Sequence, residues 1–194
     1  MKYYVTTSTH TNLFGLALSS HAHSKYLEQL LANHIILTSG LFAKPEHHTE
    51  MTIFIVDDRR QLQNYVTADP YVGRELIAGS SINEWQPTIG SLEKPAETPA
   101  NSKLFVVTYD VNPKIDLNPL KGAHKTYLKK LLKSNQLRVA GPYKGTGTEQ
   151  QGMYILNAAN RNEARKLAAA DPYLDVKSGA YFEVNEWQPK YGEF

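Results

Sequence analysis

One pattern occurs twice in this sequence and constrains its fold more than any other feature. Asp69-Pro70-Tyr71 and Asn83-Glu84-Trp85-Gln86-Pro87 return as Asp171-Pro172-Tyr173 and Asn185-Glu186-Trp187-Gln188-Pro189, 102 positions later in both cases. Upstream, Ala-His-x-x-Tyr-Leu begins at Ala22 and again at Ala123, 101 positions later. Recurrence in a fixed order at near-constant spacing indicates one structural unit used twice.

The duplication sets the expected domain organisation. The chain has 194 residues, which is enough for two domains of about 90 to 100 residues, each with its own core. We assign residues 1–90 to the first domain and 103–194 to the second. Residues 91–102, with two prolines and several small polar residues, have the composition of a linker.

Composition excludes several classes of function. A net charge of +2 is too small to indicate a nucleic-acid partner, and four lysines lie on the polar side of an expected helix, as a solvated face does: Lys125, Lys129, Lys130 and Lys133. The chain has no cysteine, which excludes disulfides and thiolate catalysis. Its opening residues are typical of a strand rather than a signal peptide, and no apolar run is long enough for a membrane span. We therefore expect a cytoplasmic protein.

Local patterns predict the same elements in both units. Strands are expected at Tyr3–Thr7, Ile35–Thr38, Met51–Val56 and Ala78–Trp85, and at Leu104–Tyr109, Leu137–Ala140, Met153–Asn157 and Ala180–Trp187. One helix follows the first strand, with Ser19-Ser20 as its N-cap in the first unit. A second helix is capped by Asp57 or Asp58 in the first unit and by Asn160 in the second, and ends before the proline at Asp69 or Asp171. Gly40 and Gly141 are expected in tight turns that close the second strands.

This order of elements defines the expected fold. Strand, helix, strand, strand, helix, strand is the ferredoxin-like βαββαβ arrangement, in which two helices back one face of an antiparallel sheet. The other sheet face needs a partner, and the second unit can supply it. The prediction is an α+β chain of tandem ferredoxin-like units, packed as an intramolecular dimeric α/β barrel. Such a chain can be a monomer with an internal pseudo-dimer, and a further homodimer is compatible with it.

The motifs resemble those of the YCII family of small ferredoxin-like domains that pair as dimeric α/β barrels. The shared features are the first strand, the His-x-x-Tyr-Leu helix start, a glycine after the second strand and Ala-Asp-Pro-Tyr after the second helix. The resemblance covers residues 2–90 and 103–192. It implies a catalytic His and Asp pair in a pocket, and some family members act as lyases or dehalogenating enzymes on small cyclic compounds.

Carried to this sequence, the family pair is His124 with Asp171, and His23 with Asp69. The substrate-binding residues that we expect are Asp110, Lys121, Tyr127 and Tyr173. The first unit has Thr9 and Ser20 at the positions of Asp110 and Lys121, so chemistry is expected chiefly in the second unit. An imidazole oriented by a carboxylate suits general acid/base catalysis near neutral pH. No nucleophile accompanies the pair, which favours proton abstraction, elimination or isomerisation of a small molecule.

Other interpretations of these residues stay open at this point. Each Asp-Pro-Tyr can be a helix N-cap, and each histidine can be a buried structural residue. The chain is then a non-catalytic small-molecule or partner-binding module, and monooxygenases of related barrels are an analogy at the level of the fold. His21, His23, His47 and His48 have no established metal-ligand spacing, and no phosphate-binding loop is present, so neither a metal nor a cofactor is expected. Trp85 and Trp187 are expected to be packing residues.

Overall fold

The computed structural model describes residues 1–43, 48–92, 98–144, 151–175, 179–192 and 194 of the chain. These residues form two compact units. Unit 1 comprises residues 1–84 and 188–194, and unit 2 comprises residues 85–187. None of the described helices is long and apolar enough to cross a membrane.

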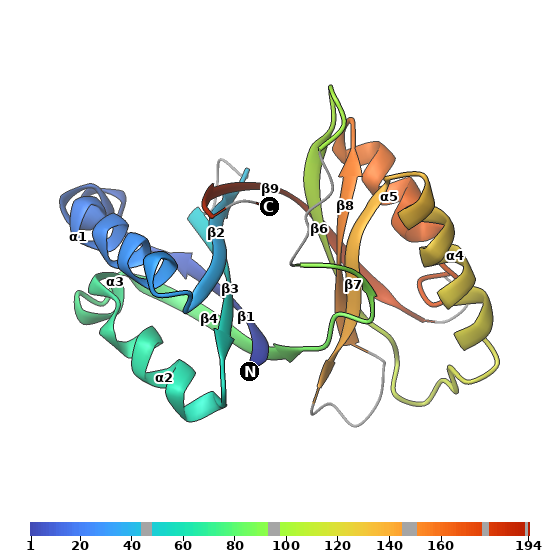
Figure 1. The fold of residues 1–194 in the computed structure, drawn as a ribbon, viewed down its shortest axis with the longest axis horizontal. Helices are drawn as coiled ribbons and strands as arrows, with labels where there is room; N and C mark the ends of the chain where they lie inside the picture. The colour runs from blue at the N-terminus through green and yellow to red at the C-terminus, as the bar shows by residue number, and fades with distance from the viewer. Residues whose placement is uncertain (44–47, 93–97, 145–150, 176–178, 193) are drawn as a thin grey trace. The chain divides into compact units, whose positions relative to one another are not determined.

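Unit 1 is a sheet in the order β4-β1-β3-β2, with its helices on one face (Figure 1). Its elements are β1 (Lys2–His10), α1 (Leu13–Ala32), β2 (Ile36–Phe42), β3 (His48–Val56), α2 (Arg59–Ala68), α3 (Pro70–Gly73) and β4 (Ile77–Trp85). Strand β3 runs antiparallel to both β1 and β2. This is the ferredoxin-like order that the sequence predicts, with α3 added.

Unit 2 repeats this arrangement, with α4 and α5 on one face of its sheet (Figure 1). Its elements are β5 (Ile89–Gly90), β6 (Lys103–Asp110), α4 (Lys121–Lys133), β7 (Leu137–Lys144), β8 (Gln151–Ala158), α5 (Arg161–Ala169) and β9 (Tyr181–Tyr191). The strand order is β9-β6-β8-β7-β5, and every neighbouring pair is antiparallel. The register shifts between Leu137 and Val139 in β7, as it does between Ile36 and Thr38 in β2.

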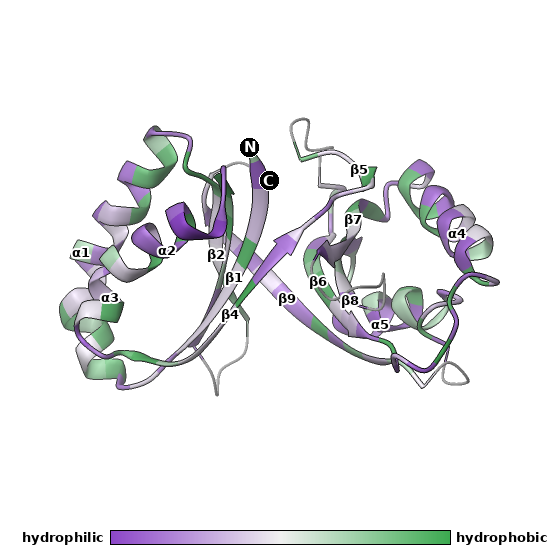
Figure 2. Cartoon of the chain, turned by 90° about the horizontal axis from the view of Figure 1, so that it is seen from below, coloured by the Kyte–Doolittle hydropathy of each residue, from purple (hydrophilic) through white to green (hydrophobic). Residues whose placement is uncertain are grey.

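Each unit has its own apolar core between helices and sheet. Tyr4, Leu27, Leu30, Phe54 and Leu62 are buried in unit 1; Phe105, Leu128, Leu131, Leu156 and Ala164 are buried in unit 2. Figure 2 shows hydrophobic and hydrophilic residues alternating around helices α1 and α4, as expected for helices that cover a sheet. Burial of each large side chain stabilises the fold by about 1.5–3 kcal/mol. Trp85 and Trp187 are buried too, as expected for packing residues.

The prediction that Gly40 and Gly141 form tight turns is wrong, because both lie inside strands. A Cβ atom on Gly40 would lie 2.1 Å from the backbone oxygen of Gln188, and one on Gly141 would lie 1.9 Å from that of Gln86. Real Cβ atoms essentially never come within 3.0 Å of a neighbouring atom. Glycine is therefore required by the close approach of another backbone segment, not by a turn.

The predicted N-cap of the first helix is also wrong. Helix α1 begins at Leu13, and the side chain of Asn12 accepts a hydrogen bond from the Gly15 N–H at 3.1 Å. Ser19 and Ser20 therefore lie inside the helix, and Ser20 donates to the carbonyl of Ala17. The caps of the second helices are confirmed, since Asp58 accepts from Gln61 N–H and Asn160 from Glu163 N–H.

The boundaries of the two compact units differ from those of the domains assigned from the sequence. Residues 85–90, assigned there to the first domain, pair with β7 in unit 2: Gln86 N–H donates to Pro142, and Thr88 N–H donates to Ala140. Residues 188–194, assigned there to the second domain, belong to unit 1. The short strand β5, just before the expected linker, likewise pairs with β7.

Candidate functional site

The recurring His and Asp residues come together in unit 2. His124 lies in the first turn of α4, and Asp171 follows α5 just before the proline. The imidazole Nδ1 lies 2.8 and 2.9 Å from the two carboxylate oxygens of Asp171. Because an ionised carboxylate only accepts hydrogen bonds, Nδ1 carries the proton and Nε2 is the acceptor of the neutral ring. The Asp171 side chain is fully buried.

Two tyrosines complete this arrangement in unit 2. The hydroxyl of Tyr154 donates to Asp171 Oδ2 at 2.6 Å, and the Tyr173 N–H donates to Oδ1 at 2.9 Å. Burial, with the nearby Asp171 charge, raises the pKa of Tyr154 well above its usual value, so it remains a donor. The Tyr173 ring stacks on His124 at a centroid distance of 3.8 Å. Asp171 therefore both caps the following turn and orients the imidazole, which reconciles the two interpretations of Asp-Pro-Tyr.

A cavity of about 160 Å³ adjoins His124. Its described walls are Thr88, Ile89, Tyr109, Lys121, His124, Lys125, Leu128, Gly141, Pro142, Tyr154 and Tyr173. Two lysines are thus present, whereas no carboxylate is found among these described walls. This cavity is mostly apolar, and both of its lysines come from α4.

The four residues expected to bind substrate do not all lie at this cavity. Lys121 and Tyr173 line it. The Tyr127 hydroxyl instead donates to the backbone carbonyl of Leu167 at 2.7 Å, which ties α4 to α5. Asp110 is exposed and accepts from the Gln151 side chain at 2.7 Å, and neither Asp110 nor Tyr127 is among the described walls.

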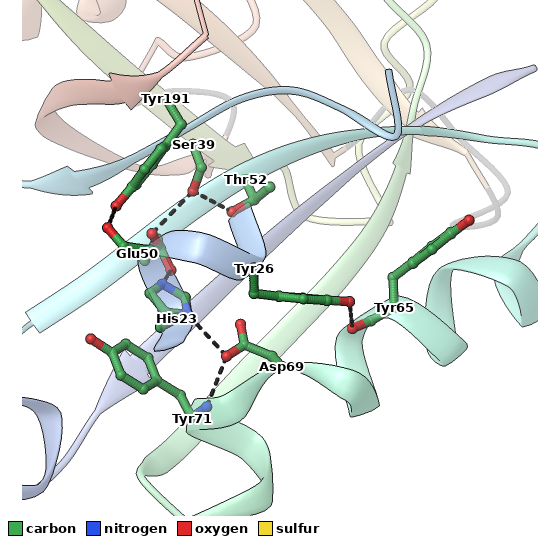
Figure 3. A network of polar contacts seen from close by, with 10 residues as sticks. His23, Tyr26, Ser39, Glu50, Thr52, Tyr65, Asp69, Tyr71 and Tyr191 are labelled. Carbon is green, nitrogen blue, oxygen red and sulfur yellow. Dashed lines mark hydrogen bonds and ion pairs between the residues drawn. The ribbon is translucent and has the colours of Figure 1, made fainter. Parts of the chain in front are cut away.

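Unit 1 holds its histidine differently (Figure 3). His23 lies in the middle of α1 rather than near its start, because the helix begins ten residues earlier. Its Nδ1 lies 2.9 Å from Asp69 Oδ1, and its Nε2 lies 3.1 Å from Glu50 Oε2. Tyr71 stacks on the ring at 3.9 Å, and its N–H donates to Asp69. The histidine is therefore held between two carboxylates.

This double contact fixes the charge of His23. Burial opposes protonation, but the hydrogen bonds to Asp69 and Glu50 outweigh it and raise the pKa of His23 to about 9. Both ring nitrogens then donate, so at neutral pH the ring has no lone pair with which to accept a proton. Glu50 is buried, and Ser39 donates to its Oε1 at 3.1 Å.

Sequence reasoning missed Glu50, Tyr109 and Tyr154. The residue in unit 2 that corresponds to Glu50 is Gly152, because each directly precedes the methionine paired with the strand glycine. A Cβ on Gly152 would lie 2.4 Å from the Tyr109 hydroxyl. A comparison of the two repeats position by position gives one signal, a carboxylate in one copy where the other has glycine.

A metal site is not supported by the described part of the chain. Among those residues no group of three or more His, Asp or Glu side chains is placed to hold a metal ion. His48 pairs with His10 across β3 and β1. His47, one of the four histidines considered above, lies outside the described residues.

Part of the sequence matches a known protein family. The model of the YCII-related domain matches residues 104–188. Residues 104–188 form a YCII-related domain. This YCII-related domain contains both His124 and Asp171, and the match does not extend into residues 1–103. No curated protein matches the chain.

Solved structures show similarity over nearly the whole chain. A chlorite dismutase variant from Candidatus Nitrospira defluvii is 12% identical with a TM-score of 0.65, covering 96% of this chain and 91% of the other. A haem-binding protein from Thermus thermophilus is 11% identical with a TM-score of 0.57, covering 96% and 91%. At such identities the likeness concerns the fold alone, and it confirms the expected class, the dimeric α/β barrels built of ferredoxin-like units.

Proposed function

We propose that the YCII-related domain is a cofactor-independent acid/base site, of lyase or isomerase type, for a small molecule. The observation that carries the proposal is the hydrogen bond from His124 Nδ1 to the fully buried Asp171 at 2.8 Å, beside a cavity. With Nδ1 occupied, Nε2 is the nitrogen that can exchange a proton with a substrate. Asp171 holds the tautomer and stabilises the imidazolium that forms.

The charge of the cavity favours an acidic substrate. Lys121 and Lys125 line it, and the one carboxylate of the dyad is buried behind His124. In an elimination, Nε2 takes the proton of a C–H bond, and that bond's electron pair forms a double bond while the leaving group departs with its own pair. In an isomerisation, the enolate formed next to the lysines is reprotonated at another atom. Small cyclic carboxylic acids and enolisable ketones fit the volume of about 160 Å³.

A second candidate is a binding module without catalysis. It is favoured by the three hydrogen bonds that Asp171 accepts, from His124, Tyr154 and the Tyr173 N–H, because they fix the local fold as well as the imidazole. In that case the pocket binds its ligand with His124 Nε2 as a hydrogen-bond acceptor. Ligand binding then occurs without turnover.

Haem is not part of the proposal, although a haem-binding protein shares the fold. The described cavities of about 250 and 160 Å³ are smaller than the roughly 300–1,000 Å³ of typical ligand sites. An axial histidine needs one nitrogen for the iron, and His23 does not offer one, because both of its nitrogens are bound by carboxylates.

We also propose that unit 1 is a diverged copy of the YCII-related domain and that the chain is a monomer. The shared His, Asp and stacked Tyr, the shared element order and the shared register shift support the first statement. Light scattering tests the second, and an obligate dimer would contradict it.

The catalytic proposal is tested in two stages. Thermal shift with a panel of small cyclic acids and ketones identifies a ligand, since one present at 100 times its Kd stabilises the protein by about 2.7 kcal/mol. Deuterium exchange into that compound is then followed by NMR. The His124→Gln variant should lose about 10² to 10⁴ in rate, as expected for loss of a positioned acid/base group.

His23→Gln is the matched control, because His23 has the same orienting Asp and the same stacked Tyr. Its exchange rate should stay within a few-fold of the parent protein. Equal losses in both variants would mean two working sites. An unchanged rate in His124→Gln would favour the binding module, provided that circular dichroism shows both variants folded.

A further inference from the structure

Unit 1 has a cavity of its own next to His23. Its volume is about 250 Å³, and it lies among α1, α3, the start of β3 and the end of β9. Leu13, Leu16 and Ala17 of α1 form an apolar wall, and His23, Glu50 and Tyr71 form part of the rest. The cavity is larger than that of the YCII-related domain, yet the family match leaves it unassigned.

Glu50 is a polar group of this cavity whose counterpart in unit 2, Gly152, has no side chain. Its side chain is about nine-tenths buried, and burying a carboxylate is costly unless partners satisfy it. His23 donates to Oε2, and Ser39 donates to Oε1. Each carboxylate oxygen has two lone pairs, so these bonds leave acceptor capacity on a group that borders the cavity.

The surrounding charges determine which ligands Glu50 can accept. The Glu50 carboxylate would repel an anion. The His23 imidazolium behind it would repel a cation, as would Lys190 in the wall. Burial lowers the pKa of His10, so its ring is neutral at neutral pH. A neutral ligand with a hydrogen-bond donor avoids both repulsions, and an apolar body matches the leucine wall.

We infer that the unit 1 cavity is a second ligand site, which binds a small neutral ring compound through a hydroxyl group that donates to Glu50. The hydroxyl hydrogen bond is charge-assisted and therefore stronger than one to a neutral acceptor. Both nitrogens of His23 lie against carboxylates, so His23 does not itself exchange a proton with the ligand. This site thus selects a neutral donor, whereas the cavity of unit 2 favours an acidic molecule.

Phenol and benzoate test this inference, because they share a ring and differ in charge at pH 7.5. The full chain is labelled with ¹³C,¹⁵N-histidine, and its imidazole signals are assigned from single His→Gln variants. Phenol should shift the signals of His10 and His23 in a saturable manner, and benzoate should leave them unchanged. Equal shifts with benzoate, or no shift with phenol, would overturn the inference.

Two variants separate Glu50 from general binding. Glu50→Gln should raise the Kd of phenol at least tenfold, because the acceptor loses its charge. Ala17→Phe, at an exposed helix position in the wall, should abolish the phenol shifts by filling the cavity without touching Glu50. Unchanged phenol binding in Ala17→Phe would place phenol elsewhere and refute the site.

The unit 2 variant His124→Gln keeps this test independent of the proposed catalytic function. Phenol should shift His10 and His23 in that variant as it does in the parent protein. If the unit 1 shifts vanish together with His124, the two sites are not independent and the inference fails. A lack of turnover at unit 2 would have no bearing on the phenol result.

Discussion

His23 and His124 have the same sequence neighbours but different partners. Each precedes a Tyr-Leu pair, is held by the Asp of an Asp-Pro-Tyr segment and stacks on its Tyr. His23 has a second carboxylate on Nε2, from Glu50, whereas among the described residues none hydrogen-bonds to the His124 Nε2. The shared motif therefore fixes the position of the imidazole, and a residue on a neighbouring strand decides whether it can accept a proton.

A small number of strand residues accounts for the difference. Gly152 stands opposite Tyr109 in the pairing of β8 with β6, whereas Glu50 stands opposite Ser8 in the pairing of β3 with β1. The Tyr109 hydroxyl occupies the space next to Gly152 that a side chain would need. In unit 2, a large residue on β6 faces a glycine on β8. This pair takes the place of the small residue and the carboxylate that face each other in unit 1.

The largest expected effect concerns the two aspartates. Asp171 is fully buried and accepts hydrogen bonds from His124, Tyr154 and the Tyr173 N–H. Asp171→Ala leaves these buried donors unpaired and should cost about 3–5 kcal/mol of unfolding free energy. Asp69 is 18% exposed and accepts from two donors, so Asp69→Ala should cost about 2 kcal/mol.

Urea denaturation at pH 7 measures both aspartate variants. Equal losses would show that burial does not separate the two dyads. Asp171→Asn is the companion variant: it keeps the volume and an acceptor, and should lose less stability than Asp171→Ala.

The second effect is the pH dependence of stability that His23 confers. Its pKa is raised from 6.5 to about 9 in the folded protein. Its contribution is therefore complete below about pH 6.5 and disappears as the pH rises through about 9. At 1.36 kcal/mol per pKa unit this amounts to about 3 kcal/mol.

The difference in unfolding free energy between the parent protein and His23→Gln, measured at pH 6 and at pH 9.5, isolates this contribution. The difference should shrink by about 3 kcal/mol at the higher pH. The same comparison can be made with Glu50→Gln in place of the parent protein, so that Asp69 is the one acidic partner of His23. The effect of His23→Gln on the unfolding free energy should then change less with pH. A difference that is constant with pH would mean that His23 is not charged between its two carboxylates.

Much of this architecture could be predicted from sequence because it depends on local patterns. The strands and the second helices with their Asp58 and Asn160 caps follow from periodicity and repeated motifs. The approach of histidine to aspartate was expected from the resemblance to the YCII family. Glu50 could not be placed at His23, because that contact depends on how α1 packs over β3. The strand glycines Gly40 and Gly141 were misinterpreted for the same reason, since the backbone that approaches each of them lies far away in the chain.

The third expected effect concerns Tyr154, whose hydroxyl donates to Asp171, and the residue at the corresponding position of unit 1. Tyr154→Phe removes the buried hydroxyl that donates to Asp171 and should cost about 1.5–3 kcal/mol. Thr52 occupies the corresponding position in β3, but its hydroxyl pairs with Ser39 rather than with Asp69. Thr52→Val should therefore cost about 1 kcal/mol. Chemical denaturation compares them, and equal costs would contradict a special role for the bond to ionised Asp171.

The smallest effect is expected where the two units are most alike. Asp58 accepts the Gln61 N–H at 2.8 Å, and Asn160 accepts the Glu163 N–H at 3.0 Å, each from an extended N-cap position. Replacement by alanine leaves one helical N–H without its side-chain acceptor, so Asp58→Ala and Asn160→Ala should each cost about 1 kcal/mol. Both caps are exposed, so water satisfies the N–H in part and keeps the cost low. Thermal denaturation at matched pH measures both, and a loss several times larger in one unit would show that the resemblance of the second helices does not extend to their energetics.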